Sequence, residues 1–377
     1  MTDENTFYSA APLAVADRVP VLVWGTGNMG RASIRAVLAH PGLELAGVVV
    51  HTAAKVGVDA GELAGAGAST GVRATTDVES ALALVAGRGA VVYAASGDIR
   101  PDDAAADVCR ALARGAAVVT PALYALYDPA SAPAELVGPI RAAAAEGGSA
   151  LFVSGIDPGW GNDVLPLLLS GLAGTVDEVR CQEIFDYSAY DQPDAVRTLV
   201  GMGEPMAYEP PMVAPGVPTM VWGGQVRLLA RGLGVELDEV RETLERRALD
   251  ADVHNAMGTF AAGTQGALRF EVQGIVGGQP RIVVEHVTRI GPDVAPDWPR
   301  PADGADGAHR VVIEGRPRLS VTIEAEDEGG NRAAGGNATA AVRLVNAIPW
   351  LRAQSPGIYD ALDVPLSPAA GRLGRSS

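Results

Sequence analysis

Three glycines near the start of the chain have the spacing of a phosphate-binding turn. Gly25, Gly27 and Gly30 follow the short apolar run 21–24 and lead into a helix-forming segment. The first glycine of such a turn permits the sharp bend, the second lets a diphosphate approach the backbone, and the third lets the helix pack closely on the strand. The helix N-terminus offers free N–H groups to an anion. Since a second apolar strand follows at 43–50, we interpret the segment as the βαβ unit of a dinucleotide-binding domain; a glycine-rich turn that binds nothing is the alternative.

The end of the second predicted strand bears on which dinucleotide binds. An NAD-specific site usually has an acidic side chain there, which binds the 2′-hydroxyl of the adenine ribose. In this chain the strand ends with His51 and Thr52, Lys55 follows shortly after, and no acid is present among them. An acid would repel a 2′-phosphate, whereas these side chains could hold one. The sequence therefore favours NADP(H), and NAD(H) is the alternative if Lys55 is only a solvated loop residue.

Further cofactor contacts are expected where neighbouring strands of the same sheet end. Short apolar runs alternate with helix-forming segments as far as residue 154, which predicts a doubly wound parallel sheet. The later strands are expected at 90–95, 116–120 and 149–154, and the helices at 80–86, 102–114 and 132–146. Ligands of such sheets lie beyond the carboxyl ends of the strands. The expected cofactor contacts are Thr26, Asn28, Met29, Ser96, Gly97, Pro121 and Ala122, with Asn346 from a returning C-terminal helix at 338–351.

Two titratable side chains lie on the apolar faces of strands predicted in the second half of the chain. Alternation places His286 on the apolar face of the segment 281–290 and Glu183 on that of 178–187. Histidine titrates near neutrality, and a carboxylate on an apolar face must be paired or have a raised pKa. If the two strands are neighbours, Glu183 and His286 form a buried acid–base pair that serves catalysis. A purely structural hydrogen-bonded pair is the alternative.

Two more candidates follow strands of the first sheet. Tyr124 comes after the fourth predicted strand and Asp157 after the fifth, so both are expected beside the crevice in which the cofactor lies. Each is a candidate contact to the substrate or the nicotinamide. The alternatives are that both only shape their loops, with Asp157 capping the next helix, expected at 163–172.

The pattern changes after residue 158. Period-two alternation and short turns predict antiparallel strands with one wet face, in an α+β second domain. The strands are expected at 178–187, 268–276, 281–290, 310–314 and 318–324, a helical block at 225–247, and a surface loop at 291–308. We therefore expect a flexible tail at 1–18, a dinucleotide-binding domain at 19–156 with about 337–365, and a substrate domain at 157–336.

Composition limits the possible partners. The 377 residues carry a formal net charge of −16, which argues against a nucleic-acid partner. The two cysteines, Cys109 and Cys181, have no metal-ligand spacing and predict no disulfide scaffold or zinc site. We expect a cytoplasmic protein, because neither a signal peptide nor an apolar run long enough for a membrane span is recognised. Apolar strands with few basic residues favour a mostly apolar small-molecule substrate.

Several motifs resemble the dihydrodipicolinate-reductase-like group, and most closely its branch of 2,4-diaminopentanoate dehydrogenase and the native amine dehydrogenases. They are the glycine-rich turn, Gly155-Ile-Asp-Pro-Gly-Trp160, Asp163-Val-Leu-Pro166, Glu285-His-Val-Thr-Arg289 and the segment 339–357. The resemblance covers residues 19 to 365. It implies a Rossmann domain, an α+β domain that also mediates homodimerisation, and NAD(P)-dependent interconversion of amine and ketone.

Two departures from this group matter. The His-His-x-x-Lys signature of dihydrodipicolinate reductase is absent, which argues against that activity. The amine dehydrogenases have glutamates after the fourth strand that assist attack by ammonia, and Tyr124 and Ala125 stand there in this chain. Tyr124 could instead donate a proton to a carbonyl or imine.

These observations predict an oxidoreductase that moves hydride to or from a carbon bearing nitrogen or oxygen. The amine–ketone couple competes with a ketone or preformed-imine reductase that does not use free ammonia, since the missing glutamates favour the latter. A protein that senses NADP(H) without turnover is the third reading, because no unmistakable catalytic constellation is present.

Overall fold

The computed structural model describes residues 18–97, 100–189, 193–302 and 305–373. The chain divides into two compact units. Unit 1 consists of Met1–Leu123, Pro133–Gly155 and Asn337–Ser377, and unit 2 of Tyr124–Ala132 and Ile156–Gly336.

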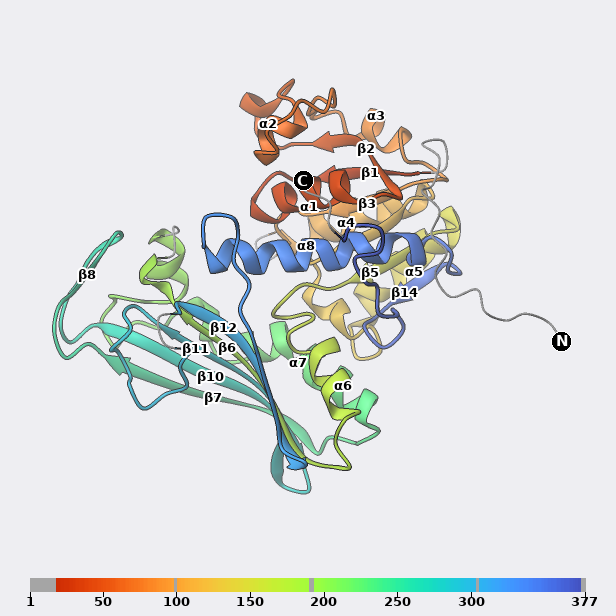
Figure 1. Ribbon diagram of the computed structural model, residues 1–377. Coiled ribbons are helices and arrows are strands. Elements are labelled where there is room, and N and C mark those ends of the chain that lie inside the picture. The colour runs from red at the N-terminus through yellow and green to blue at the C-terminus, as the bar shows by residue number, and fades with distance from the viewer. Residues whose placement is uncertain (1–17, 98–99, 190–192, 303–304, 374–377) are drawn as a thin grey trace. The chain divides into compact units, whose positions relative to one another are not determined.

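Unit 1 contains a parallel six-stranded sheet in the order β14-β5-β4-β3-β1-β2 (Figure 1). Its strands are β1 (Val19–Trp24), β2 (Leu43–Val49), β3 (Ala90–Tyr93), β4 (Ala117–Thr120), β5 (Ala150–Val153) and β14 (Gly357–Tyr359). The central strands are buried along their whole length, as expected of a sheet covered on both faces.

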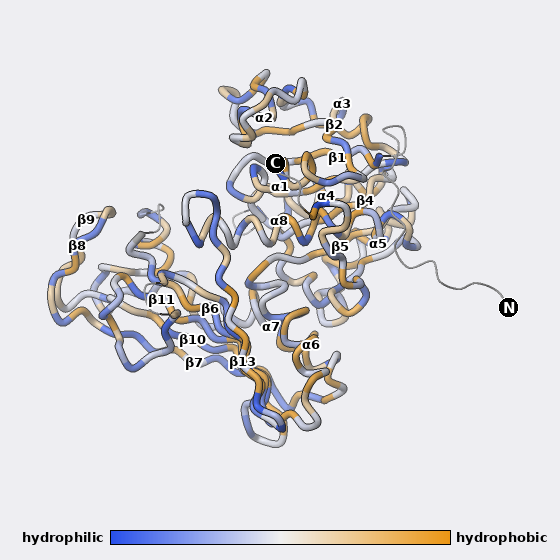
Figure 2. Tube along the Cα trace, viewed as in Figure 1, coloured by the Kyte–Doolittle hydropathy of each residue, from blue (hydrophilic) through white to orange (hydrophobic). Residues whose placement is uncertain are grey.

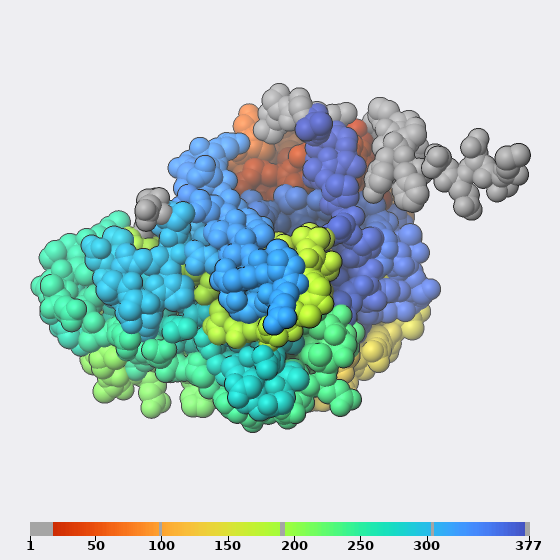
Figure 3. Space-filling model, turned by 60° about the horizontal axis from the view of Figure 1, so that its bottom comes forward, coloured from red at the N-terminus to blue at the C-terminus, as the bar shows by residue number. Residues whose placement is uncertain are grey.

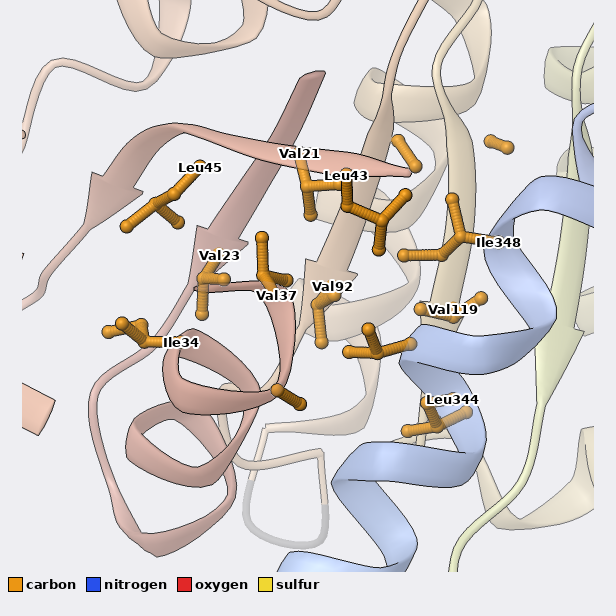
Figure 4. Close-up of a cluster of buried hydrophobic side chains, with 14 of the residues drawn as sticks. Val21, Val23, Ile34, Val37, Leu43, Leu45, Val92, Val119, Leu344 and Ile348 are labelled. Carbon is orange, nitrogen blue, oxygen red and sulfur yellow. The ribbon is translucent and has the colours of Figure 1, made fainter. Parts of the chain in front are cut away.

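The helices of this unit are α1 (Asn28–Ala39), α2 (Ala60–Ala64), α3 (Val78–Ala83), α4 (Pro101–Ala113) and α5 (Ala134–Gly147), joined by α8 (Arg332–Leu351), which begins in unit 2. One core cluster joins alternate strand residues such as Val23 and Val92 to Ile34 of α1 and to Leu344 and Ile348 of α8 (Figure 4). The C-terminal segment is therefore part of the first hydrophobic core. The predicted Rossmann-type domain is confirmed.

Unit 2 contains a mixed six-stranded sheet in the order β13-β12-β6-β11-β10-β7. Its strands are β6 (Thr175–Asp186), β7 (Glu239–Ala248), β10 (Gln265–Val276), β11 (Gln279–Arg289), β12 (Gly307–Arg316) and β13 (Leu319–Ile323), and a separate hairpin is formed by β8 (Val253–Asn255) and β9 (Gly258–Phe260). All neighbours in the large sheet are antiparallel except β6 and β11, which are parallel. The mainly antiparallel second sheet is confirmed.

Helices α6 (Val164–Ser170) and α7 (Val217–Leu233) pack on one face of the second sheet. Their apolar residues join those of β6, β10 and β11 in a second core, and α6 is mostly orange in Figure 2. Figure 3 shows β12 and β13, in blue, beside the yellow-green segment of α6 and β6, although these segments lie far apart in the sequence. Short helical turns occur at Ala53–Lys55, Tyr124–Tyr127, Tyr187–Ala189, Ala195–Leu199 and Pro211–Val213.

The helix expected at 225–247 is wrong in its second half. The segment Glu239–Ala248 is an edge strand, and β10 is its one partner among the described strands. Its Glu and Arg residues favour helix by propensity, but charged side chains also protect a sheet edge from unwanted pairing. Tertiary pairing therefore decided the structure of this segment.

Candidate functional site

The glycine-rich turn between β1 and α1 has the geometry of a diphosphate cradle. Gly25 has a φ of +109°, and a Cβ on Gly30 would lie 2.0 Å from the Gly25 carbonyl oxygen, so helix and turn are in direct contact. A Cβ on Gly27 would instead meet nothing within 4 Å. Gly27 also precedes the first residue of α1, Asn28, and contributes no side-chain cap to the helix. The turn therefore leaves open space in front of unpaired helix N–H groups, which fits the diphosphate of a dinucleotide.

Lys55, the only lysine in the sequence, reaches back to this turn. Its Nζ donates to the Thr26 carbonyl oxygen at 3.3 Å and to Thr26 Oγ1 at 3.1 Å. His51 and Thr52, at the end of β2, are exposed and have room for a ligand. The structure thus places Lys55 beside the diphosphate cradle, whereas His51 and Thr52 occupy the position expected for ribose contacts. Met29, in the first turn of α1, packs against the core.

The loops after β3 and β4 are in contact with each other. A Cβ on Gly97 would lie 2.0 Å from the Ala122 carbonyl oxygen, so only glycine fits there. The Ala122 N–H donates to Thr120 Oγ1, and this hydroxyl donates to the Tyr93 carbonyl oxygen. Ser96 is exposed, and Pro121 is half-buried beside Ala122. These four predicted contacts share the carboxyl edge of the first sheet.

Asn346 does not join them. Its Oδ1 accepts a hydrogen bond from Arg372 at 2.7 Å, and the Arg372 charge lies close enough to His40 to help lower the pKa of that imidazole, after burial, to about 4. His40 lies just before β2, at the amino edge of the sheet. The predicted contact between Asn346 and the nicotinamide therefore has no geometric support, because the helix α8 carries this residue to the opposite edge from the glycine-rich turn.

Asp157 is the centre of a polar cluster inside unit 2. Its Oδ1 accepts from Trp222 Nε1 at 2.6 Å and from Asn162 Nδ2 at 2.7 Å, and lies 3.1 Å from His286 Nε2. Both members of the Asp157–His286 pair are buried. The helix α6 is capped by Asp163, whose side chain accepts from the Val164 N–H, so Asp157 is not a helix cap.

The environment stabilises the charged forms of Asp157 and His286. Burial raises the pKa of Asp157, but the His286 charge and the donors around it outweigh burial and leave the pKa lowered. Burial likewise lowers the pKa of His286, but the Asp157 carboxylate outweighs it and leaves the pKa raised. The His286 ring stacks on Phe270 at 4.5 Å and tilts against Trp222 at 4.3 Å between ring centroids. The two side chains therefore form a rigid buried ion pair.

Glu183 lies in one row with two imidazoles across the second sheet. It pairs in register with His286 on β11 and with His309 on β12. His309 Nε2 is 3.4 Å from Glu183 Oε2, and Glu183 is the most exposed of the three, with 20% of its side chain accessible. The two strands are neighbours, which was the condition for a Glu183–His286 pair, but the close partner of His286 is Asp157 and that of Glu183 is His309.

Tyr124 lies in the short turn Tyr124–Tyr127, which packs against α7. Its ring stacks on Tyr127 at 6.5 Å between centroids. Burial, followed by the charges of nearby groups that include Asp157, raises the pKa of Tyr127 well above its ordinary value. The structure brings Tyr124 into the same unit as the other three catalytic candidates.

One ligand atom from each of Asp157, Glu183 and His286 lies within 4.8 Å of the other two, which raises the question of a metal site. The Asp157 oxygen that faces His286 already has two N–H donors, and a divalent ion would have to compete with them. Proton exchange among these groups fits the donor set better than coordination.

Sequence reasoning missed three members of this cluster. Asn162 stands close behind Asp157 in a motif rich in glycine and aspartate, which was a usable signal. His309 lies on the apolar face of a strand whose start was predicted one residue too late to include it. Trp222 comes from α7 and gave no signal, because a tryptophan in an apolar helix is ordinarily a packing residue.

Comparison with known proteins gives a consistent result. The C-terminal domain of 2,4-diaminopentanoate dehydrogenase matches residues 162–374, and the N-terminus of dihydrodipicolinate reductase matches residues 19–91. A protein named amine dehydrogenase from Streptomyces virginiae is 68% identical over 358 residues, which cover 95% of this chain and 99% of that protein. A 2,4-diaminopentanoate dehydrogenase from Acetoanaerobium sticklandii is 25% identical over 252 residues, 66% of each chain.

The solved structure of an amine dehydrogenase from Mycobacterium smegmatis has the same fold, with a TM-score of 0.72 and 20% identity over 93% of this chain and 97% of that one. In the part of the chain that the structure describes, no helix is long and apolar enough to cross a membrane.

Proposed function

This chain belongs to the amine dehydrogenase family that shares its C-terminal domain with 2,4-diaminopentanoate dehydrogenase, and from that membership we propose that it interconverts a small ketone and its primary amine, with free ammonia and NADP(H). It is an NAD(P)-dependent oxidoreductase that acts on an amine or imine carbon. An NADP(H) sensor without turnover is no longer a candidate. Two further proposals concern the residue that takes a proton from the substrate nitrogen and the cofactor that is preferred.

Glu183 is our candidate for the residue that takes a proton from nitrogen. The observation that carries this assignment is its position in the row between His286 and His309, with the buried Asp157–His286 pair behind it. The family's glutamates after the fourth strand are replaced by Tyr124 and Ala125, so a carboxylate must come from elsewhere. Glu183 is the accessible carboxylate of this cluster, and His309 is near enough to share a proton with it.

The proposed sequence of proton movements follows from this geometry. In amine oxidation, Glu183 removes one proton from the substrate ammonium, and the freed lone pair forms the C=N bond as hydride leaves the carbon. The nicotinamide supplies the hydride acceptor. Glu183 then releases its proton to solvent and water adds to the C=N carbon. One proton of this water passes through Glu183 to the nitrogen, and the other is released as the C=O bond forms and ammonia leaves. A positive charge on His286 would stabilise the Glu183 carboxylate between turnovers, and the Asp157 carboxylate favours that charged form by raising the pKa of His286.

We propose that NADP(H) is preferred. His51 and Thr52 follow β2 without an acidic neighbour, and both are exposed to a bound ribose phosphate. Gly25, Gly27 and Gly30, with Thr26 and Lys55, would hold the diphosphate that NAD(H) and NADP(H) have in common.

We further propose that the substrate domain, residues 157–336, joins two copies of the chain into a homodimer. The face of the second sheet opposite α7 carries a partly buried network in which Glu285 accepts from Arg180 at 2.7 Å and from Arg269 at 2.8 Å. Charged groups this well paired are compatible with an interface between copies. Sedimentation equilibrium that gives the mass of a single chain would contradict this part of the proposal.

The proposed function is tested by an assay of hydride transfer, in which the absorbance of the reduced cofactor is monitored. NADPH and NADH are each offered with a panel of small ketones, with and without ammonium. We expect oxidation of NADPH that requires ammonium, and a lower KM for NADPH than for NADH. The Glu183→Gln variant is expected to lose kcat by about a hundredfold, typical of a lost general base, while the Kd for NADPH stays unchanged.

Because the glutamates that assist attack by ammonia are missing, reduction without free ammonia is the competing function, and the same assay tests it. Oxidation of NADPH by a ketone without ammonium, abolished by Tyr124→Phe but not by Glu183→Gln, would show a carbonyl reductase in which Tyr124 is the proton donor. Activity only with a preformed cyclic imine would show an imine reductase.

A further inference from the structure

The helix α8 brings a guanidinium to the carboxyl end of β5 in unit 1. Arg343 Nε donates to Ser154 Oγ at 3.2 Å, and Ser154 is the residue that directly follows β5. The guanidinium carbon lies 5.5 Å from the centroid of the Phe152 ring, which is fully buried in the same strand. The Ser154 N–H donates in turn to the Thr120 carbonyl oxygen, at the end of β4, at 3.1 Å. The charge of Arg343 is therefore held beside the ends of β4 and β5.

The placement of Arg343 follows from the packing of α8 on the first sheet. The next residue, Leu344, enters the core of unit 1 (Figure 4), and Arg343 lies half-buried at the margin of that core. Asn346, one turn further along the helix, accepts instead from Arg372. The other arginine of α8, Arg332, belongs to unit 2. Arg343 is therefore the cation that this helix contributes to unit 1.

The order of the strands indicates which part of a dinucleotide lies near Arg343. The diphosphate belongs at the glycine-rich turn after β1, and the adenine ribose at the end of β2, where His51 and Thr52 are exposed. On the other side of β1 the sheet continues through β3 and β4 to β5. Neighbouring strands are about 4.8 Å apart, so β4 lies roughly 10 Å and β5 roughly 14 Å from β1. The nicotinamide half of an extended dinucleotide leaves the diphosphate in this direction, towards the ends of β4 and β5.

A fixed positive charge in this place distinguishes the two redox forms of the cofactor. The nicotinamide ring is cationic when oxidised and neutral when reduced, so a neighbouring guanidinium repels the oxidised ring alone. The N–H donors of a guanidinium also suit the carboxamide oxygen, which both forms carry. An arginine keeps its charge throughout the neutral pH range, so the discrimination does not depend on a titration.

From this arrangement we propose that Arg343 faces the nicotinamide and makes the protein bind NADPH more tightly than NADP⁺. Arg343 then discriminates between redox states, whereas His51 and Thr52 discriminate between NADP(H) and NAD(H). It takes the place that was expected for Asn346 among the cofactor contacts. The inference rests on the proposed binding of the cofactor along the first sheet, and it does not depend on the role of Glu183 or on the use of ammonia.

The test is a set of calorimetric titrations of the full-length protein with NADPH, NADP⁺ and 2′-phospho-ADP-ribose, which has the diphosphate and both riboses but no nicotinamide. We expect the unaltered protein to bind NADPH about tenfold or more tightly than NADP⁺. Arg343→Gln should reduce this ratio of Kd values by about tenfold and leave the Kd for 2′-phospho-ADP-ribose unchanged. Arg343→Met, a second neutral variant that keeps an apolar stem against Phe152, should give the same result. Arg343→Lys retains the charge and should retain most of the ratio.

The matched control is Arg352→Gln, which removes an exposed arginine directly after α8 and should leave all three affinities unchanged. If Arg343 has a purely structural role, its neutral variants will weaken the three ligands by the same factor or lower only the Tm, and either result would overturn the inference. A loss of 2′-phospho-ADP-ribose affinity as large as the loss of NADPH affinity would place Arg343 at the diphosphate and would also overturn it.

The titrations contain no amine, ketone or ammonium, so their outcome is independent of the chemistry proposed for Glu183. Redox discrimination that disappears in Arg343→Gln, in a protein without ammonium-dependent turnover, would support this inference and contradict the proposed function. Ammonium-dependent turnover with equal affinities for NADPH and NADP⁺ would leave the proposed function standing and remove only this inference.

Discussion

At the scale of single residues, one oxygen of Asp157 has three nitrogen neighbours. The Trp222 N–H can be removed by a substitution that keeps an aromatic ring in its place. Trp222→Phe retains a ring against His286 and Phe270 but deletes the N–H that donates to Asp157 at 2.6 Å. Losing one hydrogen bond to a buried charge should reduce the free energy of unfolding by about 1–3 kcal/mol, measured by urea denaturation. Trp298→Phe is the matched control, because the buried Trp298 Nε1 has no hydrogen-bond partner among the residues that the structure describes.

The Asp157–His286 pair predicts a pH dependence of stability. The pKa of His286 is raised from 6.5, so its contribution is complete below pH 6.5 and is lost as pH rises through the raised value. The pKa of Asp157 is lowered from 3.8, so its contribution is complete above that pH and is lost as pH falls through the lowered value. Asp157→Asn should therefore lower the free energy of unfolding most near pH 5 to 6, by about 3–5 kcal/mol, and by progressively less as the pH rises above neutrality. Urea denaturation over a pH series measures this, and a cost independent of pH would refute it.

Substitutions of Lys55 and Thr52 should have different effects: one weakens the binding of both cofactors, and the other changes the preference between them. Lys55→Ala is expected to raise the Kd for NADPH and NADH by similar factors, about fivefold to tenfold, because Nζ lies at the turn that meets the diphosphate. Thr52→Glu should weaken NADPH alone, since the added carboxylate would repel the 2′-phosphate. Fluorescence titration gives each Kd. Because the sequence contains a single lysine, its acylation rate, followed by mass spectrometry, should also fall when either cofactor is bound.

At the scale of elements, glycine-to-alanine substitutions at two positions of the glycine-rich turn should have different effects, one on stability and one on cofactor binding. Gly30→Ala places a Cβ 2.0 Å from the Gly25 carbonyl and must push α1 away from the turn, which should destabilise the fold by about 1–3 kcal/mol. Gly27→Ala meets open space, so its Tm should be unchanged while the Kd for NADPH rises by about tenfold. Thermal unfolding and cofactor titration of both variants test this, and a Gly27→Ala variant with normal affinity would show that no diphosphate approaches there.

Elements with strong local patterns were predictable from the sequence, and elements decided by distant partners were not. The parallel strands of unit 1 are short apolar runs between helix-forming segments, and nothing competes with that pattern. The strand β7 reads as a helix because its Glu, Arg and Leu residues suit one, and only pairing with β10 makes it a strand. The strand β14 is too short to be recognised, and it is a strand because β5 offers it an edge.

At the scale of the whole molecule, the catalytic candidates could be selected from the sequence but their pairing could not. Alternation correctly put Glu183 and His286 on the same face of neighbouring strands. That Asp157 would be the close partner of His286 depends on how the loop after β5 packs against α7, and no periodic signal reports such a contact. The family and its chemistry were recognised from short motifs, because a motif reflects local geometry. Which side chains pair within the cluster depends on contacts between distant segments, and these could not be predicted from the sequence.

The path of the chain has a consequence for how the protein is made. Unit 1 is assembled from three separate stretches, and its core includes Leu344, Val345 and Ile348 of the last one. A ribosome therefore delivers every residue of unit 2 before the first core can close. Until Leu344 and Ile348 have emerged from the exit tunnel, the apolar residues of unit 1 that pack against them stay exposed, so we expect this unit to finish folding only after unit 2 has been synthesised.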